Sequence, residues 1–188
     1  MKKIFTSVVL FLIVYFSCAQ IPNAGFELWD NQPVLLKWQT NSRPLTLPPW
    51  DPYIVKRDTD SYSGNYAANF YANGFFKPFA TTTFPVSIHP QNLTLYYKLS
   101  FAPCVNDSGY FQQDTASVLV EILNGNTVVD SGYWESTTTN FNYSQLVIPV
   151  SQNATVFDSC RISIWGGKVL GGCGIIAAPT EFKVYQAE

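Results

Sequence analysis

Apolar residues recur at every second position along much of the chain, which is the spacing of β-strands with one buried face. The clearest runs are 94–101 (TLYYKLSF) and 117–122 (SVLVEI). The Asn-Gly pair at 124–125 lies between two such runs and predicts a tight hairpin. Further strands are expected at 53–57, 66–71, 143–150, 161–165 and 181–185. With Gly, Pro, Asn, Asp and Ser between the runs, the pattern predicts an all-β chain, a jelly-roll β-sandwich of about eight to ten antiparallel strands.

The same alternation assigns side chains to opposite sides of a sheet, because a shift of one residue would expose the whole apolar set. Five outward side chains are expected to share one exterior face: Tyr96, Lys98, Glu121, Arg161 and Trp165. Aromatic rings can stack on the apolar faces of sugar rings, and polar groups beside them can bind hydroxyls. This face is therefore the predicted carbohydrate-binding site, with Tyr110 and Trp134 as two further candidates.

The first residues have the pattern of a cleaved export signal. Lys2 and Lys3 precede an apolar run over 4–16, and small residues follow at 17–19. The run is short for a membrane span, and no second apolar segment follows it. We therefore expect a signal peptide over residues 1–19, followed by a single domain over residues 20–188.

The export signal predicts a protein that is secreted or held at the cell surface. Lipid attachment at Cys18 is an alternative, although Tyr15 and Phe16 are poor residues for the positions before a lipidated cysteine. Loss of two lysines with the signal would change the formal net charge from −2 to −4. A negative chain of this kind carries no footprint for nucleic acid or an acidic membrane.

Aromatic residues make up 16% of the chain and charged residues only 13%, which indicates a folded chain rich in ring surface. The expected partner is a polysaccharide or other glycan, with cell-surface proteins as the alternative.

Three cysteines follow the predicted signal, at Cys104, Cys160 and Cys173. An oxidising compartment favours one disulfide and leaves one thiol over. The pair Cys104–Cys160 is favoured, because these residues flank strands that could lie antiparallel, but Cys160–Cys173 is closer in sequence. None of the spacings resembles a zinc site.

The stretch NAGFELWDNQPVLLKW, followed by VKRDTDSYSGNYAANF, resembles the start of secreted bacterial jelly-roll domains related to carbohydrate-binding modules, with a galactose-binding-like β-sandwich. Later pieces of the chain continue the resemblance: YYKLSF, Asp114 before TASVLVEI, and DSCRISIW. The matching residues of the opening are Asn23, Gly25, Phe26, Glu27, Trp29, Trp38, Ser63, Gly64 and Ala67. The resemblance implies a non-catalytic module that binds carbohydrate.

The resemblance further implies a structural Ca²⁺, which several related modules hold with the glutamate of the opening motif and an acid of the final strand. The matching candidates are Glu27 and Glu181, although Thr180-Glu181 stands where the family usually has two aspartates. One acid fewer leaves less charge for a hard cation. Without a metal, Glu27 is expected to bind backbone N–H groups near Ser63-Gly64, while Phe26 and Trp29 pin a first strand to the core.

Candidates for catalysis are few. His89 is the only histidine, and with no acid or nucleophile close in sequence it is expected to be an ordinary surface residue. A pair among Glu121, Glu135, Asp114 and Asp158 could hydrolyse glycosides, although turn and cap roles are commoner for the two aspartates. We therefore expect no enzyme, with a surface or adhesion protein lacking a sugar site as the second hypothesis and a small glycan-active hydrolase or lyase as the third.

Overall fold

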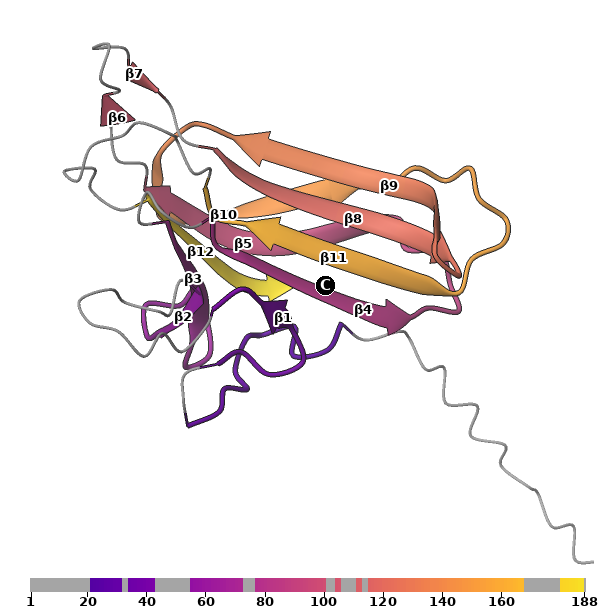
Figure 1. The fold of residues 1–188 in the computed structure, drawn as a ribbon, viewed down its shortest axis with the longest axis horizontal. Coiled ribbons are helices and arrows are strands. Elements are labelled where there is room, and N and C mark those ends of the chain that lie inside the picture. Colours follow the sequence, from indigo (N-terminus) through magenta and orange to yellow (C-terminus); the bar gives the residue numbers. More distant parts are fainter. Residues whose placement is uncertain are drawn as a thin grey trace, which may run out of the picture.

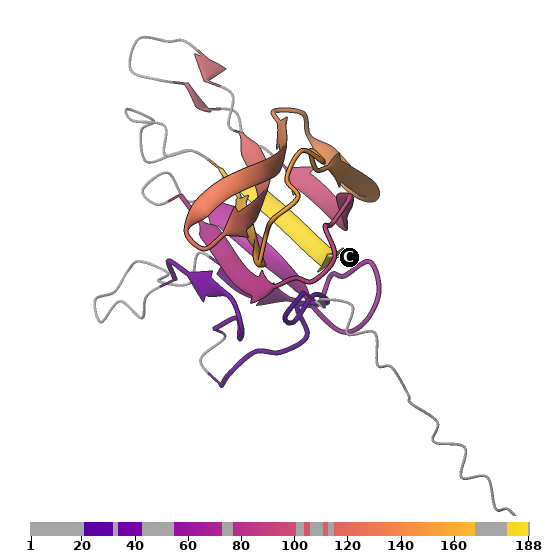
Figure 2. The same ribbon diagram turned by 90° about the vertical axis from the view of Figure 1, so that its right-hand side faces the viewer.

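A computed structural model describes residues 21–31, 34–42, 55–72, 77–100, 104–105, 111–112, 115–167 and 180–187, with backbone alone at 72, 104–105, 111–112 and 180–187. Two five-stranded antiparallel sheets pack face to face (Figures 1 and 2). The first, called the β11 sheet, has the order β1 (Gln39–Thr40), β4 (Phe79–Pro85), β11 (Ser159–Trp165), β8 (Ala116–Asn124) and β9 (Thr127–Ser136). The second, called the β5 sheet, has the order β10 (Asn140–Pro149), β5 (Asn92–Ser100), β12 (Thr180–Ala187), β3 (Ala67–Ala72) and β2 (Val55–Asp58).

Successive strands often change sheet, as from β3 to β4, β4 to β5 and β9 to β10. A short ribbon of β6 (Cys104–Val105) and β7 (Phe111–Gln112) projects from one end (Figure 1). The prediction of an all-β sandwich of antiparallel strands is confirmed. Within the described residues, no helix is long and apolar enough to cross a membrane.

The core lies between the sheets and is built by the alternation read from the sequence. Its central side chains are no more than 1% exposed: Leu95, Leu99, Val118, Val120, Ile122, Ile162 and Ile164. Full burial of each such side chain contributes about 1.5–3 kcal/mol. The register is therefore strongly specified, because a one-residue slip would turn these side chains to water.

The predicted hairpin joins β8 to β9. Gly125 has a φ of 61°, a left-handed conformation that glycine adopts without a steric penalty. Sequence reasoning missed β4 (FATTTFP), because threonine interrupts the apolar signal there. Thr82 nevertheless faces inward at 5% exposure, since its hydroxyl donates to the carbonyl of Lys37 at 3.0 Å.

The opening motif forms a turn, so the prediction that it begins the first strand is wrong. Asn23 has a φ of 52°, and its side chain bonds the backbone N–H of Leu28 at 2.9 Å and the Leu28 and Leu36 carbonyls at 3.0 Å. Phe26 is fully buried, with its ring 5.3 Å from that of Trp38. The expected anchoring of this segment to the core is therefore present, and the Asn23 side chain holds the turn.

Both disulfides considered from the sequence require Cys160, and the structure contradicts both. Cys160 is a free thiol, 2% exposed, on the core side of β11. Burial, with a smaller contribution from the charge of Glu121, raises the pKa of this thiol to about 12. Figure 1 shows the β6 ribbon at the end of the sandwich opposite the start of β11, where Cys160 lies. Position 160 and the β6 strand that carries Cys104 therefore lie at opposite ends of the sandwich.

Candidate functional site

Glu121 and Arg161 lie directly opposite each other on the outer face of the β11 sheet, as the alternation predicted. Nε of Arg161 donates to Oε2 of Glu121 at 2.7 Å, with side chains 39% and 14% exposed respectively. The bond to Glu121 raises the pKa of the guanidinium, which opposes the smaller lowering caused by burial. The pair thus presents fixed donors and acceptors at one end of this face.

Trp165 ends β11 on the same outer face, half-buried and directly opposite Ser117. The ammonium group of Lys77 lies 5.3 Å from the centroid of its ring, within the range of a cation–π interaction. The structure therefore confirms that the indole lies outside the core.

Tyr133 of β9 adds a ring that sequence reasoning missed, 57% exposed on the same face. Its hydroxyl donates to the carboxylate of Glu135, and this bond, with burial as a smaller cause, raises the pKa of the phenol. The alternation of Val118 and Val120 on β8 could have found it, since Tyr133 pairs with the outward Leu119.

Ser163 lies between Trp165 and Arg161 on β11, and the outward Leu119 lies between Ser163 and Tyr133. Thr81 and Ser163 occupy adjacent outward positions, with their hydroxyl oxygens 2.9 Å apart, and Ser163 is only 7% exposed. This outer surface of the β11 sheet, with Trp165, Tyr133 and the Arg161–Glu121 pair, is here called the β11 face.

Tyr96 and Lys98 also point outward, but from β5, on the outer face of the opposite sheet. The expectation that they share a face with Glu121, Arg161 and Trp165 is therefore wrong. Period-two alternation determines which side of its own sheet a residue occupies, but it carries no information about which sheet a strand joins.

The outer surface of the β5 sheet around Tyr96 and Lys98 is here called the β5 face. Segment 59–66, between β2 and β3, lies against it. The ring of Tyr62 stacks on that of Tyr96, with centroids 4.0 Å apart and planes inclined by 7°. Lys98 forms an ion pair with Asp60, whose carbonyl accepts a 2.6 Å hydrogen bond from the hydroxyl of Tyr143. Burial, followed by the charges of Asp60 and Asp58, raises the pKa of Tyr143. Both predicted sugar-binding side chains are thus already in contact with the chain's own loop.

The two additional candidates have different outcomes. Trp134 is partly buried against the core, with its ring 4.9 Å from that of Tyr97 in an edge-to-face arrangement. Its register opposite Val118 directs it inward, so it does not belong to the β11 face. Tyr110 lies outside the described residues, and its role stays a prediction.

The Glu27 carboxylate binds backbone N–H groups, which is the metal-free arrangement expected from the sequence. Oε1 accepts the amide of Asn65 at 2.9 Å and that of Tyr66 at 3.2 Å, 38 and 39 residues away in the chain. Glu27 therefore ties the opening turn to the end of segment 59–66.

These contacts do not by themselves build a calcium site. Ca²⁺ takes six to eight oxygen ligands, whereas two N–H donors point at this oxygen, and the described residues hold no cluster of three His, Cys, Asp or Glu side chains. Glu181 pairs with Tyr71 and Ser100 through its backbone, and its side chain lies outside the described part of the structure. The calcium ion stays a prediction.

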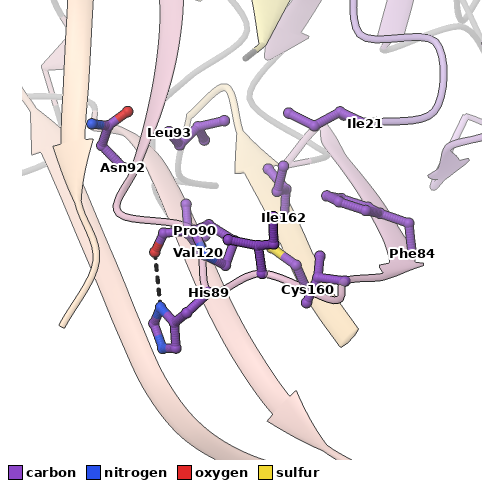
Figure 3. Close-up of a pocket in the computed structure, with 11 residues that line it drawn as sticks. Ile21, Phe84, His89, Pro90, Asn92, Leu93, Val120, Cys160 and Ile162 are labelled. Carbon is purple, nitrogen blue, oxygen red and sulfur yellow. Dashed lines mark hydrogen bonds between the residues drawn. The ribbon is translucent and has the colours of Figure 1, made fainter. Parts of the chain in front are cut away.

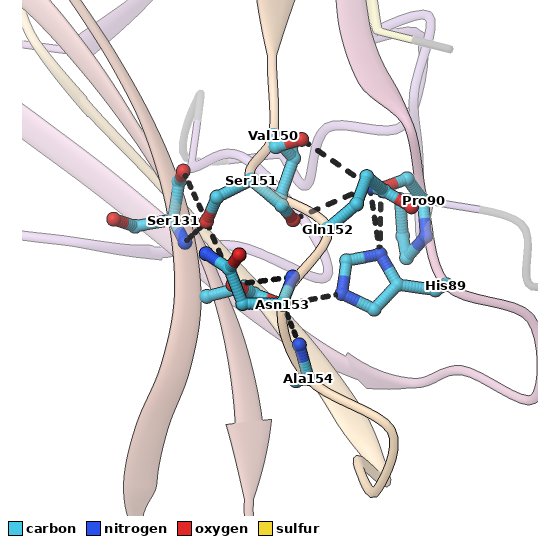
Figure 4. Close-up of polar contacts among 9 residues, drawn as sticks. His89, Pro90, Ser131, Val150, Ser151, Gln152, Asn153 and Ala154 are labelled. Carbon is cyan, nitrogen blue, oxygen red and sulfur yellow. Dashed lines mark hydrogen bonds and ion pairs between the residues drawn. The ribbon is translucent and has the colours of Figure 1, made fainter.

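A buried aspartate, Asp130, lies near the start of β9 at one end of the sandwich, and Figure 4 shows His89 and residues 151–154 around it. Asp130 is 4% exposed and accepts hydrogen bonds from the Ser151 hydroxyl at 2.8 Å and from the amides of Asn153 and Ala154, the latter at 2.7 Å. Nε2 of His89 lies 2.9 Å from its Oδ2. This cluster, completed by Gln152, is here called the Asp130 clasp, and it joins β9 of one sheet to the segments flanking β10 and β5 of the other.

His89 is thus a fixed part of this clasp, with a side chain 12% exposed, and the expectation of an ordinary surface histidine is wrong. Its Nδ1 lies 3.0 Å from the Gln152 amide nitrogen and from the carbonyl of Pro90. No sequence signal links it to Asp130, 41 residues away.

The clasp contains Ser, His and Asp but does not have the geometry of a nucleophilic triad. Ser151 and His89 each bind the carboxylate of Asp130, whereas a triad requires the serine to bind the histidine. Burial alone would raise the pKa of Asp130, but the donors from Ala154, Ser151, His89 and Asn153 outweigh it and hold that pKa well below its usual range. The clasp is therefore a structural unit.

The remaining acid considered for catalysis, Asp158, has a turn role. It accepts the Ser159 hydroxyl at 2.6 Å and the Gly125 amide at 2.7 Å. These bonds, with the one from Ser159 as the larger cause, lower the pKa of Asp158. Asp114 lies outside the described residues.

Comparisons with known proteins bear on the fold. No protein-family model matches the chain, and no curated protein matches its sequence. A candidate glycoside hydrolase from Bacteroides thetaiotaomicron has a similar structure, with a TM-score of 0.59 and 9% identity over 86% of this chain and 64% of that one. The module TmCBM61, solved in complex with β-1,4-galactotriose, gives a TM-score of 0.55 and 15% identity over 91% of this chain and 97% of that one.

A third similar structure comes from carbohydrate-binding modules of the β-sandwich superfamily with promiscuous specificity. Its TM-score is 0.51 at 8% identity, over 92% of this chain and 62% of that one. At such low identities the likeness establishes architecture, and the resemblance stated from the sequence is confirmed at that level. The chain has the β-sandwich fold of the carbohydrate-binding modules.

Proposed function

We propose that the protein is a non-catalytic carbohydrate-binding module that acts outside the cell and holds its ligand on the β11 face. The observation that carries the proposal is the placement of Trp165, Tyr133 and the Arg161–Glu121 pair on one outer face. Sugar rings present C–H faces that stack on aromatic rings and hydroxyls that bind planar polar groups. The export signal read from the sequence supports the location.

The arrangement of acids favours binding over hydrolysis. Glu121 and Glu135 are four residues out of register on neighbouring strands, which separates their backbones by about 14 Å. The carboxylates of glycosidases lie about 5–9.5 Å apart. Each of these two is also held by a neighbour on the face, Glu121 by Arg161 and Glu135 by Tyr133.

The experiment is a titration of tryptophan fluorescence with a panel of soluble polysaccharides that includes β-1,4-galactan, because TmCBM61 was solved with a β-1,4-galactotriose ligand. We expect saturable but weak binding, since one or two stacked rings offset little of the ordering cost. In Trp165→Ala the affinity should fall about thirtyfold, the loss typical of a truncated hot-spot tryptophan.

The matched control is Tyr62→Ala, which removes an exposed ring from segment 59–66 on the opposite side of the sandwich and should leave the affinity unchanged. The melting temperature of Trp165→Ala should equal that of the wild type. Failure of the whole panel to bind, or equal losses in both variants, would contradict the proposal. Release of reducing ends from the same panel would show an enzyme instead.

A further inference from the structure

A cavity of about 210 Å³ opens between the two sheets beside the segment that joins β4 to β5 (Figure 3). Phe84, Cys160 and Ile162 line it from the β11 sheet, Leu93 lines it from the β5 sheet, and Ile21 closes one side. Along β11, the lining residues Cys160 and Ile162 lie about 17 Å and about 10 Å from Trp165, so the cavity is displaced from the indole toward the start of the strand. It also lies on the core side of the sheet and is independent of the β11 face.

The walls are apolar and the few polar groups are at the mouth. Val86, Leu93 and Ile162 are each no more than 6% exposed, whereas Ile88 at the mouth is 62% exposed. Asn92 is exposed there, and His89 is held in place by Asp130 and Gln152. Because the Asp130 clasp fixes this histidine, the mouth is preorganised for a ligand.

The dimensions and lining together indicate the kind of ligand. A core cavity of about 150 Å³ lined by apolar side chains is known to bind benzene. The larger volume here has room for a ring of phenol to indole size. A phenyl ring, a thiol and an imidazole all make favourable contacts with aromatic ligands, and all three line the cavity in Phe84, Cys160 and His89.

We propose that this cavity binds a small aromatic compound, of one ring or of indole size, which inserts its ring between Phe84, Leu93 and Ile162 and leaves one polar substituent at the mouth near Asn92. The site is separate from the carbohydrate face, and either can be present without the other.

The experiment is titration of the full chain, labelled at methyl groups, with indole, followed by NMR. We expect saturable shifts of the Leu93, Val120 and Ile162 methyls. Leu119 is the internal reference, because it neighbours Val120 on β8 but points to the opposite side of the sheet. Absence of saturable shifts, which would also result if another part of the chain filled the cavity, would overturn the proposal.

The variant Val86→Phe places a ring in the cavity and should weaken indole binding at least tenfold. Val147→Phe is the matched control: the same change at a valine that is 50% exposed on β10 should leave binding unchanged. Equal affinity in the two variants would contradict the proposal.

A second measurement does not depend on folding of the Val86→Phe variant. Alkylation of Cys160 in the wild type by N-ethylmaleimide, followed by peptide mass spectrometry, should slow at least threefold at saturating indole. Cys104, whose backbone lies in the projecting β6 ribbon, is the reference and should react at an unchanged rate in the same sample. An unchanged rate at Cys160 would overturn the proposal.

Discussion

The two outer faces of the sandwich carry similar side chains in different surroundings. On the β11 face, Trp165 contacts Lys77, which lies just before β4, and Tyr133 contacts Glu135 of its own strand. On the β5 face, Tyr96 and Lys98 are engaged by segment 59–66, which arrives from between β2 and β3. Strand alternation placed all these residues toward water, but a loop from elsewhere in the chain decides which of them a ligand can reach.

The difference has an energetic consequence. A sugar on the β5 face would have to displace the ring of Tyr62 and separate Lys98 from Asp60 before it could make contacts of its own. A sugar on the β11 face meets no such covering segment among the described residues. Because binding already costs several kcal/mol of lost motion, an added rearrangement favours the β11 face.

The largest loss of stability is expected at the Asp130 clasp, because its contacts join the two sheets that carry the two faces. Asp130→Ala removes the acceptor that joins β9 to the segments beside β10 and β5, and leaves buried donors without a partner. We expect the melting temperature to fall more than in any other variant named here, as measured by calorimetry. A near-wild-type value would show that the two sheets are held together elsewhere.

The same clasp limits the stability of both faces in acid. The pKa of Asp130 is lower in the folded state than in the unfolded state, so as the pH falls this carboxylate is protonated in the unfolded chain first. Its contribution is therefore fully present above the ordinary aspartate pKa of about 4 and is lost as the pH falls below it. Between pH 6 and pH 2 the melting temperature should fall less steeply with decreasing pH for Asp130→Asn than for the wild type. Equal slopes would show that Asp130 is not the group responsible.

The comparison of faces is tested directly by a pair of tyrosine variants. Tyr133→Ala should weaken polysaccharide binding about tenfold, because it removes an exposed ring from the proposed site. Tyr96→Ala should change the affinity less than about twofold, within ordinary variation for a residue outside the site. The reverse order would place the ligand on the β5 face and require segment 59–66 to open.

Loosening that segment should sharpen the contrast. Glu27→Gln weakens the bonds to the amides of Asn65 and Tyr66, and we expect a loss of about 1–2 kcal/mol in the free energy of unfolding. Cleavage by protease within 59–66 should become faster.

The control for Glu27→Gln is a parallel series with and without a chelator. If backbone amides are the partners of Glu27, the loss is the same in both. A melting temperature of the wild type that falls on chelation, but not in the variant, would show that Glu27 holds calcium.

The smallest effect is expected for the ion pair. Arg161→Ala should cost about 1 kcal/mol of folding stability, because the Arg161 side chain is 39% exposed, whereas that of its partner Glu121 is 14% exposed. Its effect on polysaccharide affinity should exceed that of Lys98→Ala, whose ammonium faces the covered side. Equal effects on binding would remove Arg161 from the proposed site.

The sequence by itself determined the fold class, most strands and the facing of their side chains. The period of two near Leu95, Val120 and Ile162 is a local property, and burial of one side of each strand leaves a single register. Short motifs also predicted the turn at Gly125 and the two alternative partners of Glu27, which are a metal ion and backbone N–H groups. Threonine concealed β4, since a β-branched polar residue reads as neither core nor surface.

Only the tertiary structure decided which strands share a sheet, and with that which outward residues share a face. Arg161 and Glu121 meet across β11 and β8, whereas Lys98, with an equally clear pattern, lies on the opposite side of the molecule. The contact between His89 and Asp130 and the free thiol of Cys160 likewise depend on how segments distant in sequence are arranged in space. Alternation is set by each residue's immediate neighbours, but strand order is set by how all the apolar faces are covered together.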